Sequence, residues 1–301
     1  MAQQVPLPDE ASALDPELDA ARDDHTHEVA PDVAYRRLGI VNVVFLGPSG
    51  AGDRGWVLLD AGLTGTAPLI RAAAKARFGE DARPAAIVMT HGHFDHVGAL
   101  ETLAEEWDAP VFAHPLEHPY LNGTAAYPPG DPTVGGGMMA RLARFYPTKP
   151  VDVGDRLQPL PEDGSVPFLH DWTWLHTPGH SVGHVALWRD ADRVLISGDA
   201  FCTTAQESAY DVAVQEAEMH GPPMYFTVDW DAAEASVATL AALEPEIALS
   251  FHGRPMQGAG MRAALHRLAT GFRDIAVPRD RLAEAFREAE ELRGDGDARA
   301  A

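Results

Sequence analysis

The most constraining feature of the sequence is a cluster of metal-binding side chains between two segments of different periodicity. Residues 90–96 read Thr-His-Gly-His-Phe-Asp-His, which places three imidazoles and a carboxylate within six consecutive positions. Residues 84–90 form a short apolar run typical of a buried strand, and residues 97–104 have the pattern of a helix start. The cluster is therefore expected on a strand-to-helix loop, where a rigid scaffold commonly displays functional groups.

The spacing inside this cluster favours a metal site. His91, His93 and Asp95 alternate, so an extended backbone would point all three to one side, and His96 would follow as the chain turns. Neutral imidazoles and carboxylates are the usual ligands of zinc and related ions. The alternative is a histidine-rich surface loop that binds nothing.

Short apolar runs and amphipathic segments alternate along the rest of the chain. Strands are expected at 38–46, 55–60, 84–90, 110–114, 167–176, 184–189, 193–197 and 245–250, and helices at 65–78, 97–107, 231–242, 258–275 and 279–293. A turn of Pro, Ser and Gly between the first two strands indicates a hairpin. This alternation therefore predicts an α/β fold with mixed rather than purely parallel sheets.

Two long irregular stretches interrupt this alternation, at residues 117–137 and 201–229. Long loops in compact domains are often lids or binding walls. Their Met, Tyr and Phe residues could equally anchor them to the core, and the sequence leaves both interpretations open.

Charge and cysteine content exclude several classes of protein. The formal net charge of −22 disfavours nucleic acids and anionic membrane surfaces as partners. Cys202 is the only cysteine, so an intrachain disulfide and a cysteine-based zinc site are impossible. With no apolar run long enough to span a bilayer and no secretory signal pattern, we expect a cytoplasmic protein with a small-molecule substrate, and a homodimer is conceivable.

Further ligand candidates lie where later strands end. His180 follows a Pro-Gly turn after the strand at 167–176, Asp199 follows the strand at 193–197, and His252 follows the strand at 245–250. Strands that end at one edge of a sheet bring their terminal residues together. Combined with the first cluster, these residues supply five histidines and two aspartates, enough for two metal ions.

This ordered set resembles the metallo-beta-lactamase fold superfamily, whose pattern is His-x-His-x-Asp-His followed by a His, an Asp and a His. The resemblance runs from about residue 33 to 275, and residues 59–62 resemble the family's early Asp-Gly turn. It implies an αββα sandwich of two mixed sheets with flanking helices and a metal site along one edge. Together with the resemblance, composition divides the chain into three regions: an acidic, mobile arm at 1–27, a metallo-hydrolase domain at 28–278, and a helix of mixed charge with a tail at 279–301.

The resemblance assigns the ligands of two divalent ions, for which zinc is expected and iron or manganese are alternatives. The first ion would be held by His91, His93 and His180, the second by Asp95, His96 and His252, with Asp199 bridging the two.

For other residues near these positions, the sequence predicts supporting or structural roles. Asp60 matches a family position beside the site, where it would either orient a ligand through a hydrogen bond or simply cap its turn. His184 could play a similar supporting role. Cys202 is expected to be a packed thiol, and the following histidines are expected to be structural or exposed: His114, His118, His170, His176, His220 and His266.

The resemblance implies a hydrolase in which a metal-bridging hydroxide attacks the carbonyl of a small ester, lactone or thioester. Asp95 or Asp199 would then pass a proton to the leaving group. Asp199 stands where beta-lactamases tend to carry Cys or Ser, which favours the branch that resembles glyoxalase II and the lactonases. Lactonases often carry a Tyr where this chain has Cys202, although Tyr210 or Tyr225 could substitute.

Two alternatives remain open. Relatives of this fold such as the persulfide dioxygenases bind a single iron and oxidise sulfur compounds. A catalytically silent binding protein is the other alternative, and the complete ligand set argues against it.

Overall fold

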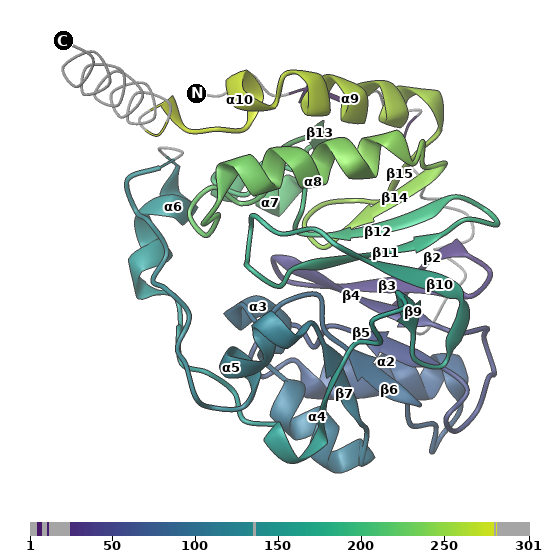
Figure 1. Cartoon of the computed structure of the whole chain (residues 1–301). Helices are drawn as coiled ribbons and strands as arrows, with labels where there is room; N and C mark the ends of the chain where they lie inside the picture. Colours follow the sequence, from purple (N-terminus) through teal and green to yellow (C-terminus); the bar gives the residue numbers. More distant parts are fainter. Residues whose placement is uncertain (1–4, 8–10, 12–24, 135–136, 280, 282–301) are drawn as a thin grey trace, which may run out of the picture.

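The two central sheets of the molecule face each other. The computed structural model describes residues 5–7, 11, 25–134, 137–279 and 281. Helices cover the outer side of each sheet, so the layers run helix, sheet, sheet, helix (Figure 1). The expected αββα sandwich of two mixed sheets is confirmed.

The first sheet contains seven strands in chain order: β2 (His27–Ala30), β3 (Val33–Leu38), β4 (Val41–Leu46), β5 (Val57–Leu59), β6 (Ala86–Val88), β7 (Val111–Ala113) and β8 (Leu157–Pro159). Neighbours from β2 to β5 are antiparallel, and neighbours from β5 to β8 are parallel. Parallel neighbours need long crossovers, and these contain α2 (Ala67–Phe78) and α4 (Leu100–Trp107). The strand expected at 38–46 is confirmed over 41–46 as β4, which forms the expected hairpin with β5. Its first residues are wrong, because Leu38 ends β3 and Gly39 turns the chain at φ 73°.

The second sheet contains six strands in the order β15-β14-β12-β11-β10-β9. They are β9 (Ser165–Val166), β10 (Leu169–His176), β11 (Val185–Arg189), β12 (Val194–Gly198), β14 (Ile247–Ser250) and β15 (Met256–Gln257). β12 and β14 are parallel and are joined through α8 (Trp230–Ala242). α9 (Gly258–Thr270) and α10 (Phe272–Ile275) follow, with α8 and α9 side by side over this sheet (Figure 1).

Strand β4 shows why the layers are stable. All six of its residues are buried, because one face contacts the outer helices and the other contacts the second sheet. Val43 and Phe45 pack with the helix layer, whereas Val44 and Leu46 pack between the sheets. The period of two along a strand separates these two sets.

Shorter elements lie in the connections. They are α3 (Phe94–Val97), η2 (Pro115–Glu117), α5 (His118–Leu121), α6 (Met138–Leu142), η3 (Ala143–Phe145), η4 (Gly154–Arg156) and α7 (Ala209–Val214). The two irregular stretches pack against each other, because Val134 lies in one buried cluster with Met224, Tyr225 and Phe226. Phe94 is partly buried against this cluster, which therefore lies beside the histidine-rich segment.

At the described positions of the N-terminal region, the chain packs on the domain. β1 (Val5–Pro6) pairs with β13 (Glu218–Met219), and Val5 and Leu7 are buried in the layer between the second sheet and its helices. Ala11 is buried in the same layer. The other positions of the arm before residue 25 lie outside the described residues, as do residues 280 and 282–301 of the expected C-terminal helix and tail. In the part of the chain that the structure describes, no helix is both long and apolar enough to cross a membrane.

Candidate metal centre

The seven expected ligands lie just beyond the ends of four strands. His91 and His93 follow β6, His180 lies in the loop after β10, Asp199 directly follows β12, and His252 follows β14. β12 and β14 are parallel, and two antiparallel steps make β10 parallel to them as well. Their carboxyl ends therefore meet at one edge, and all seven side chains are buried there.

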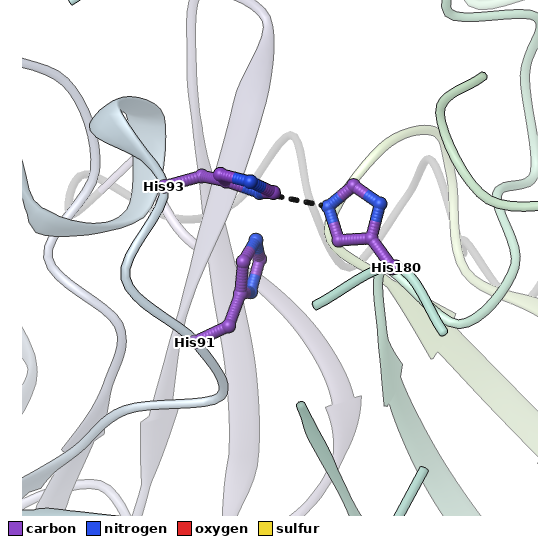
Figure 2. Close-up of side chains that lie close together, drawn as sticks. All are labelled: His91, His93 and His180. Atoms are coloured by element: carbon purple, nitrogen blue, oxygen red, sulfur yellow. Dashed lines mark hydrogen bonds between the residues drawn. The ribbon is translucent and has the colours of Figure 1, made fainter. Parts of the chain in front are cut away.

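Three imidazoles form a first group, which we call the first trio: His91, His93 and His180. Figure 2 shows their rings pointing toward one another, with His180 approaching from a different loop. Nδ1 of His93 lies 2.9 Å from Nε2 of His180, and the ring of His91 is 4.6 Å from that of His93 and 4.9 Å from that of His180. One ligand atom from each residue lies within 4.8 Å of the others.

A second group, the second trio, consists of Asp95, His96 and His252. Oδ2 of Asp95 lies 3.6 Å from Nε2 of His252. Asp199 lies between the two trios, because its Oδ2 is 3.4 Å from Nε2 of His180, 3.4 Å from Nε2 of His96 and 3.0 Å from Nε2 of His252.

The expected reason for the clustering of His91, His93 and Asp95 is wrong. Helix α3 begins at Phe94, with His93 as its N-cap, so Asp95 lies in a helical turn and not on an extended chain. The change of backbone direction at His93 sends Asp95 to the second trio and leaves His91 and His93 in the first. The sequence pattern suggested extended backbone because a helix of four residues has too few positions to show a period.

Several buried atoms at the centre have no hydrogen-bond partner among the described residues: Nε2 of His91, Nε2 of His96 and Oδ1 of Asp199. Buried polar atoms are normally satisfied, so such atoms point to a missing group. Imidazole nitrogens and carboxylate oxygens together are typical zinc ligands. The donor set therefore fits metal ions.

The electrostatics of the two trios differ. Burial lowers the pKa values of His91 and His93 well below the usual range and that of His180 to about 3. These imidazoles are therefore neutral, which is the form that binds metal. In the second trio burial opposes protonation, but the charges of Asp199 and Asp95, together with hydrogen bonds to carboxylates, outweigh it and raise the pKa values of His96 and His252. Carboxylates thus favour positive charge in this half of the centre.

Hydrogen bonds orient two ligands of the second trio. Asp60 Oδ2 lies 2.7 Å from Nδ1 of His96, and the carbonyl of Ile40 lies 2.8 Å from Nδ1 of His252. Each bond engages Nδ1 and leaves Nε2 directed at the centre. Asp60 also accepts from the backbone and hydroxyl of Thr90, at 2.7 and 2.6 Å. The orienting role proposed for Asp60 is thus supported by contact, and its φ of 58° shows that it also forms the turn.

His184 supports the centre without belonging to either trio. Its Nε2 accepts a hydrogen bond from the backbone N–H of Asp199 at 2.9 Å, and its Nδ1 lies 2.8 Å from the hydroxyl of Thr177. Burial lowers the pKa of His184 to about 4, so the ring is neutral and can accept this bond. His184 therefore holds the backbone of the residue that lies between the trios.

Glu117 and Tyr127 also lie at the centre, and neither was predicted from the sequence. Both side chains are buried, and both contact the backbone N–H of Gly92, which lies between two residues of the first trio. Glu117 lies in a His-Pro-Leu-Glu segment after a predicted strand, where an acidic residue gives no periodic signal. Its partners are far away in sequence, so only the fold brings them together.

The remaining candidate residues are a cysteine, two tyrosines and six histidines, none of which belongs to either trio. Cys202 is fully buried, and burial raises the pKa of its thiol well above the usual value. Tyr210 is 71% exposed on α7, whereas Tyr225 is buried beside the centre. The six histidines expected to be structural or exposed lie outside both trios.

These observations define an αββα protein with a buried centre of histidines and aspartates at the edge of its two sheets. Comparison with known proteins gives the family, because residues 36–252 match the metallo-beta-lactamase superfamily. The probable metallo-hydrolase YflN of Bacillus subtilis (strain 168) is 45% identical over 259 residues, which cover 86% of this chain and 97% of that protein. The chain therefore belongs to the metallo-beta-lactamase superfamily.

Solved structures show the same fold. A beta-lactamase domain protein from Burkholderia ambifaria superposes with a TM-score of 0.58 at 21% identity, covering 86% of this chain and 80% of that one. A structure described as the first B3 metallo-beta-lactamase with an active-site glutamic acid has a TM-score of 0.57, also at 21% identity, and covers 89% and 97%. At this identity the likeness concerns the fold alone.

Proposed function

We propose that this protein is a metal-dependent hydrolase that acts on the carbonyl of a small ester, lactone or thioester. The observation that carries the proposal is the position of Asp199, whose Oδ2 lies 3.4 Å from His180 of the first trio and 3.0 Å from His252 of the second. One carboxylate between two sets of ligands suits two divalent ions held close together. The similarity to a probable metallo-hydrolase supports the same reaction class.

The chain supplies ligands and proton carriers, and the ions would supply the nucleophile. When bound, two divalent ions would lower the pKa of a shared water toward neutrality and polarise the carbonyl. We propose zinc, because imidazole and carboxylate ligands suit it, with iron and manganese as alternatives. Asp95 and Asp199 are the groups proposed to pass a proton to the leaving group, since Asp199 lies between the trios and Asp95 belongs to the second one.

A cavity beside the centre supports a small substrate. It has a volume of about 320 Å³ and is lined by His93, Tyr225, Phe226 and Trp230 among other residues. Tyr225, Phe226 and Trp230 give the wall an aromatic part that suits an apolar acyl group, and Asp131 and Arg281 add polar groups to it. Tyr225 is the better of the two tyrosine candidates for contact with substrate, because Tyr210 lies exposed on α7. The net charge of −22 favours a neutral small molecule over a nucleic acid.

Metal quantification on the purified protein, combined with a panel of lactones, thioesters and beta-lactams, tests this proposal. We expect two ions per chain and hydrolysis of at least one oxygen or thiol ester. His93→Ala is expected to lose metal and hydrolysis while remaining folded. His266→Ala is the matched control, because it removes a half-exposed imidazole on α9 that contacts Glu244. Full activity in His93→Ala would contradict the proposal.

The same measurements separate the alternative, a mononuclear-iron sulfur dioxygenase. That enzyme would contain one iron per chain and would consume oxygen with a persulfide substrate. The second trio favours the hydrolase, because a mononuclear enzyme needs only one set of ligands.

A further inference from the structure

Glu117 makes the most extensive set of hydrogen bonds of any buried carboxylate in the described part of the chain. It lies at the end of η2 and has no exposed surface. Its Oε2 accepts from the backbone N–H of Gly92 at 3.0 Å and from the hydroxyl of Tyr127. Its Oε1 accepts from the hydroxyl of Ser181 and from the backbone N–H of Gly183, each at 2.8 Å.

Three of these four donors, Gly92, Ser181 and Gly183, belong to the two loops that carry the first trio, and Tyr127 belongs to the stretch that follows Glu117. Gly92 lies between His91 and His93, and Ser181 directly follows His180. The two loops come from different sheets, since one follows β6 and the other connects β10 to β11. The carboxylate of Glu117 therefore links the two loops from which the three imidazoles of the first trio converge.

The local packing is built around this carboxylate. A Cβ on Gly183 would lie 2.8 Å from Cγ of Glu117, and a Cβ on Gly92 would lie 2.9 Å from the ring of Tyr127. Only glycine allows both backbones to approach this closely. The ring of Tyr127 also packs on the ring of His93, with centroids 4.4 Å apart. Glu117 and Tyr127, which together we call the clamp, thus contact His93 directly through the tyrosine ring and hold the backbone beside the other two ligands.

The chemistry of Glu117 separates it from the ligands. A carboxylate can only accept hydrogen bonds, and four donors occupy its two oxygens. Burying such a group costs several kcal/mol unless it is satisfied in this way. Glu117 is absent from both trios. The carboxylate of Glu117 therefore interacts with donors of the two loops and is not a metal ligand.

We propose that Glu117 is a positioning residue that sets the distance between the histidine pair of one loop and His180 of the other, and so determines the affinity of the first trio for its metal. This inference rests on the metal binding proposed above and does not depend on the substrate. It differs from a general structural role, because its effect is confined to one of the two trios.

Metal titration of Glu117→Gln provides the first test. The amide replaces an accepting oxygen by a donor that faces other donors, so at least one loop is released. Zinc is titrated into metal-free protein against a competing chelator. We expect the affinity of one site to fall about 10- to 100-fold, the usual effect of losing an outer-shell partner, while the other stays within about threefold. Equal loss at both sites, or no loss at either, would overturn the inference.

A double-mutant cycle identifies the affected site. His93→Ala removes the first trio, so Glu117→Gln in that background is expected to leave the affinity of the remaining site unchanged. A further large loss there would show that Glu117 acts through the whole fold, and the inference would fail. Ser181→Ala removes one donor while keeping the carboxylate, and a smaller loss confined to the first site is expected. If Glu117→Gln does not fold, zinc titration of Ser181→Ala provides the test instead.

Hydrogen exchange in metal-free protein gives a readout that needs neither metal nor activity. The amide of Gly92 or that of Gly183, whichever faces the new NH2 group, is expected to exchange at least tenfold faster in Glu117→Gln, because it loses its carboxylate acceptor. Glu207→Gln is the matched control, since Glu207 is also buried and accepts from the backbone of Met224 at 2.9 Å. It should leave both glycine amides and the zinc affinities unchanged. Unchanged glycine exchange in Glu117→Gln would overturn the clamp, whereas wild-type protein that binds no zinc would instead refute the proposed function.

Discussion

Oδ2 of Asp60 lies 2.7 Å from Nδ1 of His96, and both side chains are completely buried. The same carboxylate accepts from Thr90, whose hydroxyl lies 3.0 Å from Nδ1 of His91. Asp60 thus orients a ligand of the second trio directly and a ligand of the first through Thr90. Outer contacts of this kind hold the tautomer and direction of a ligating imidazole.

Asp60→Asn is expected to weaken metal binding at the second trio about 10- to 100-fold, because an amide is a weaker acceptor for the N–H of His96. Asparagine tolerates the left-handed backbone of this position, so the turn should persist. Competition titration with zinc measures the change, and Asp53→Asn, on the surface beside Arg83, is the control. Unchanged affinity at both sites would show that Asp60 only forms the turn.

Removal of metal is expected to destabilise the fold. The ligands converge only in the folded state, so bound ions stabilise it by about 4 kcal/mol per site when free metal exceeds the dissociation constant a thousandfold. Chelation also leaves unsatisfied atoms such as Nε2 of His91 and Oδ1 of Asp199 buried. Urea unfolding with and without chelator measures the loss. Identical midpoints would mean that the trios hold no ion under those conditions.

Arg189→Met is expected to lower the free energy of unfolding by about 2 kcal/mol, the scale of lost hydrogen bonds to charged groups. Arg189 is 7% exposed and binds Asp192 at 2.8 and 2.7 Å and Asp32 at 2.5 Å. Its guanidinium also lies 4.7 Å from the ring of Trp172. Urea titration measures the loss, and zinc content should be unchanged because β11 holds this residue away from the centre. A change below about 0.5 kcal/mol would contradict the assignment.

His114 is expected to contribute to acid sensitivity. Burial, aided by the nearby His176 and His118, lowers its pKa to about 4. Between that value and the ordinary value of 6.5 the unfolded chain binds more protons, so stability falls as the pH falls through this window. His114→Asn removes this group but keeps an acceptor for the N–H of Leu116. The loss of unfolding free energy between pH 7.5 and pH 4.5 should be smaller in the variant, and an equal or larger loss would contradict the prediction.

The fold class was predictable because its signals are local. Apolar runs gave the strands β5, β6, β7 and β14 to within a few residues, and amphipathic periodicity gave α2, α8 and α9. β8 and β15 were missed because their sequences, Leu-Gln-Pro and Met-Gln, each contain a single large apolar residue and so form no apolar run. The hairpin of β3 and β4 was missed because its apolar residues run on through a turn of two residues.

The sequence by itself determined the residue types of the centre, since imidazoles and carboxylates repeat where strands end. Tertiary structure alone decided how they divide into two trios, with Asp199 between them and His93 and Asp95 on different sides of a helix start. It also decided that Glu117 joins two loops from different sheets. The physical reason is that contacts between distant segments depend on how the sheets pack, and no local pattern records that packing.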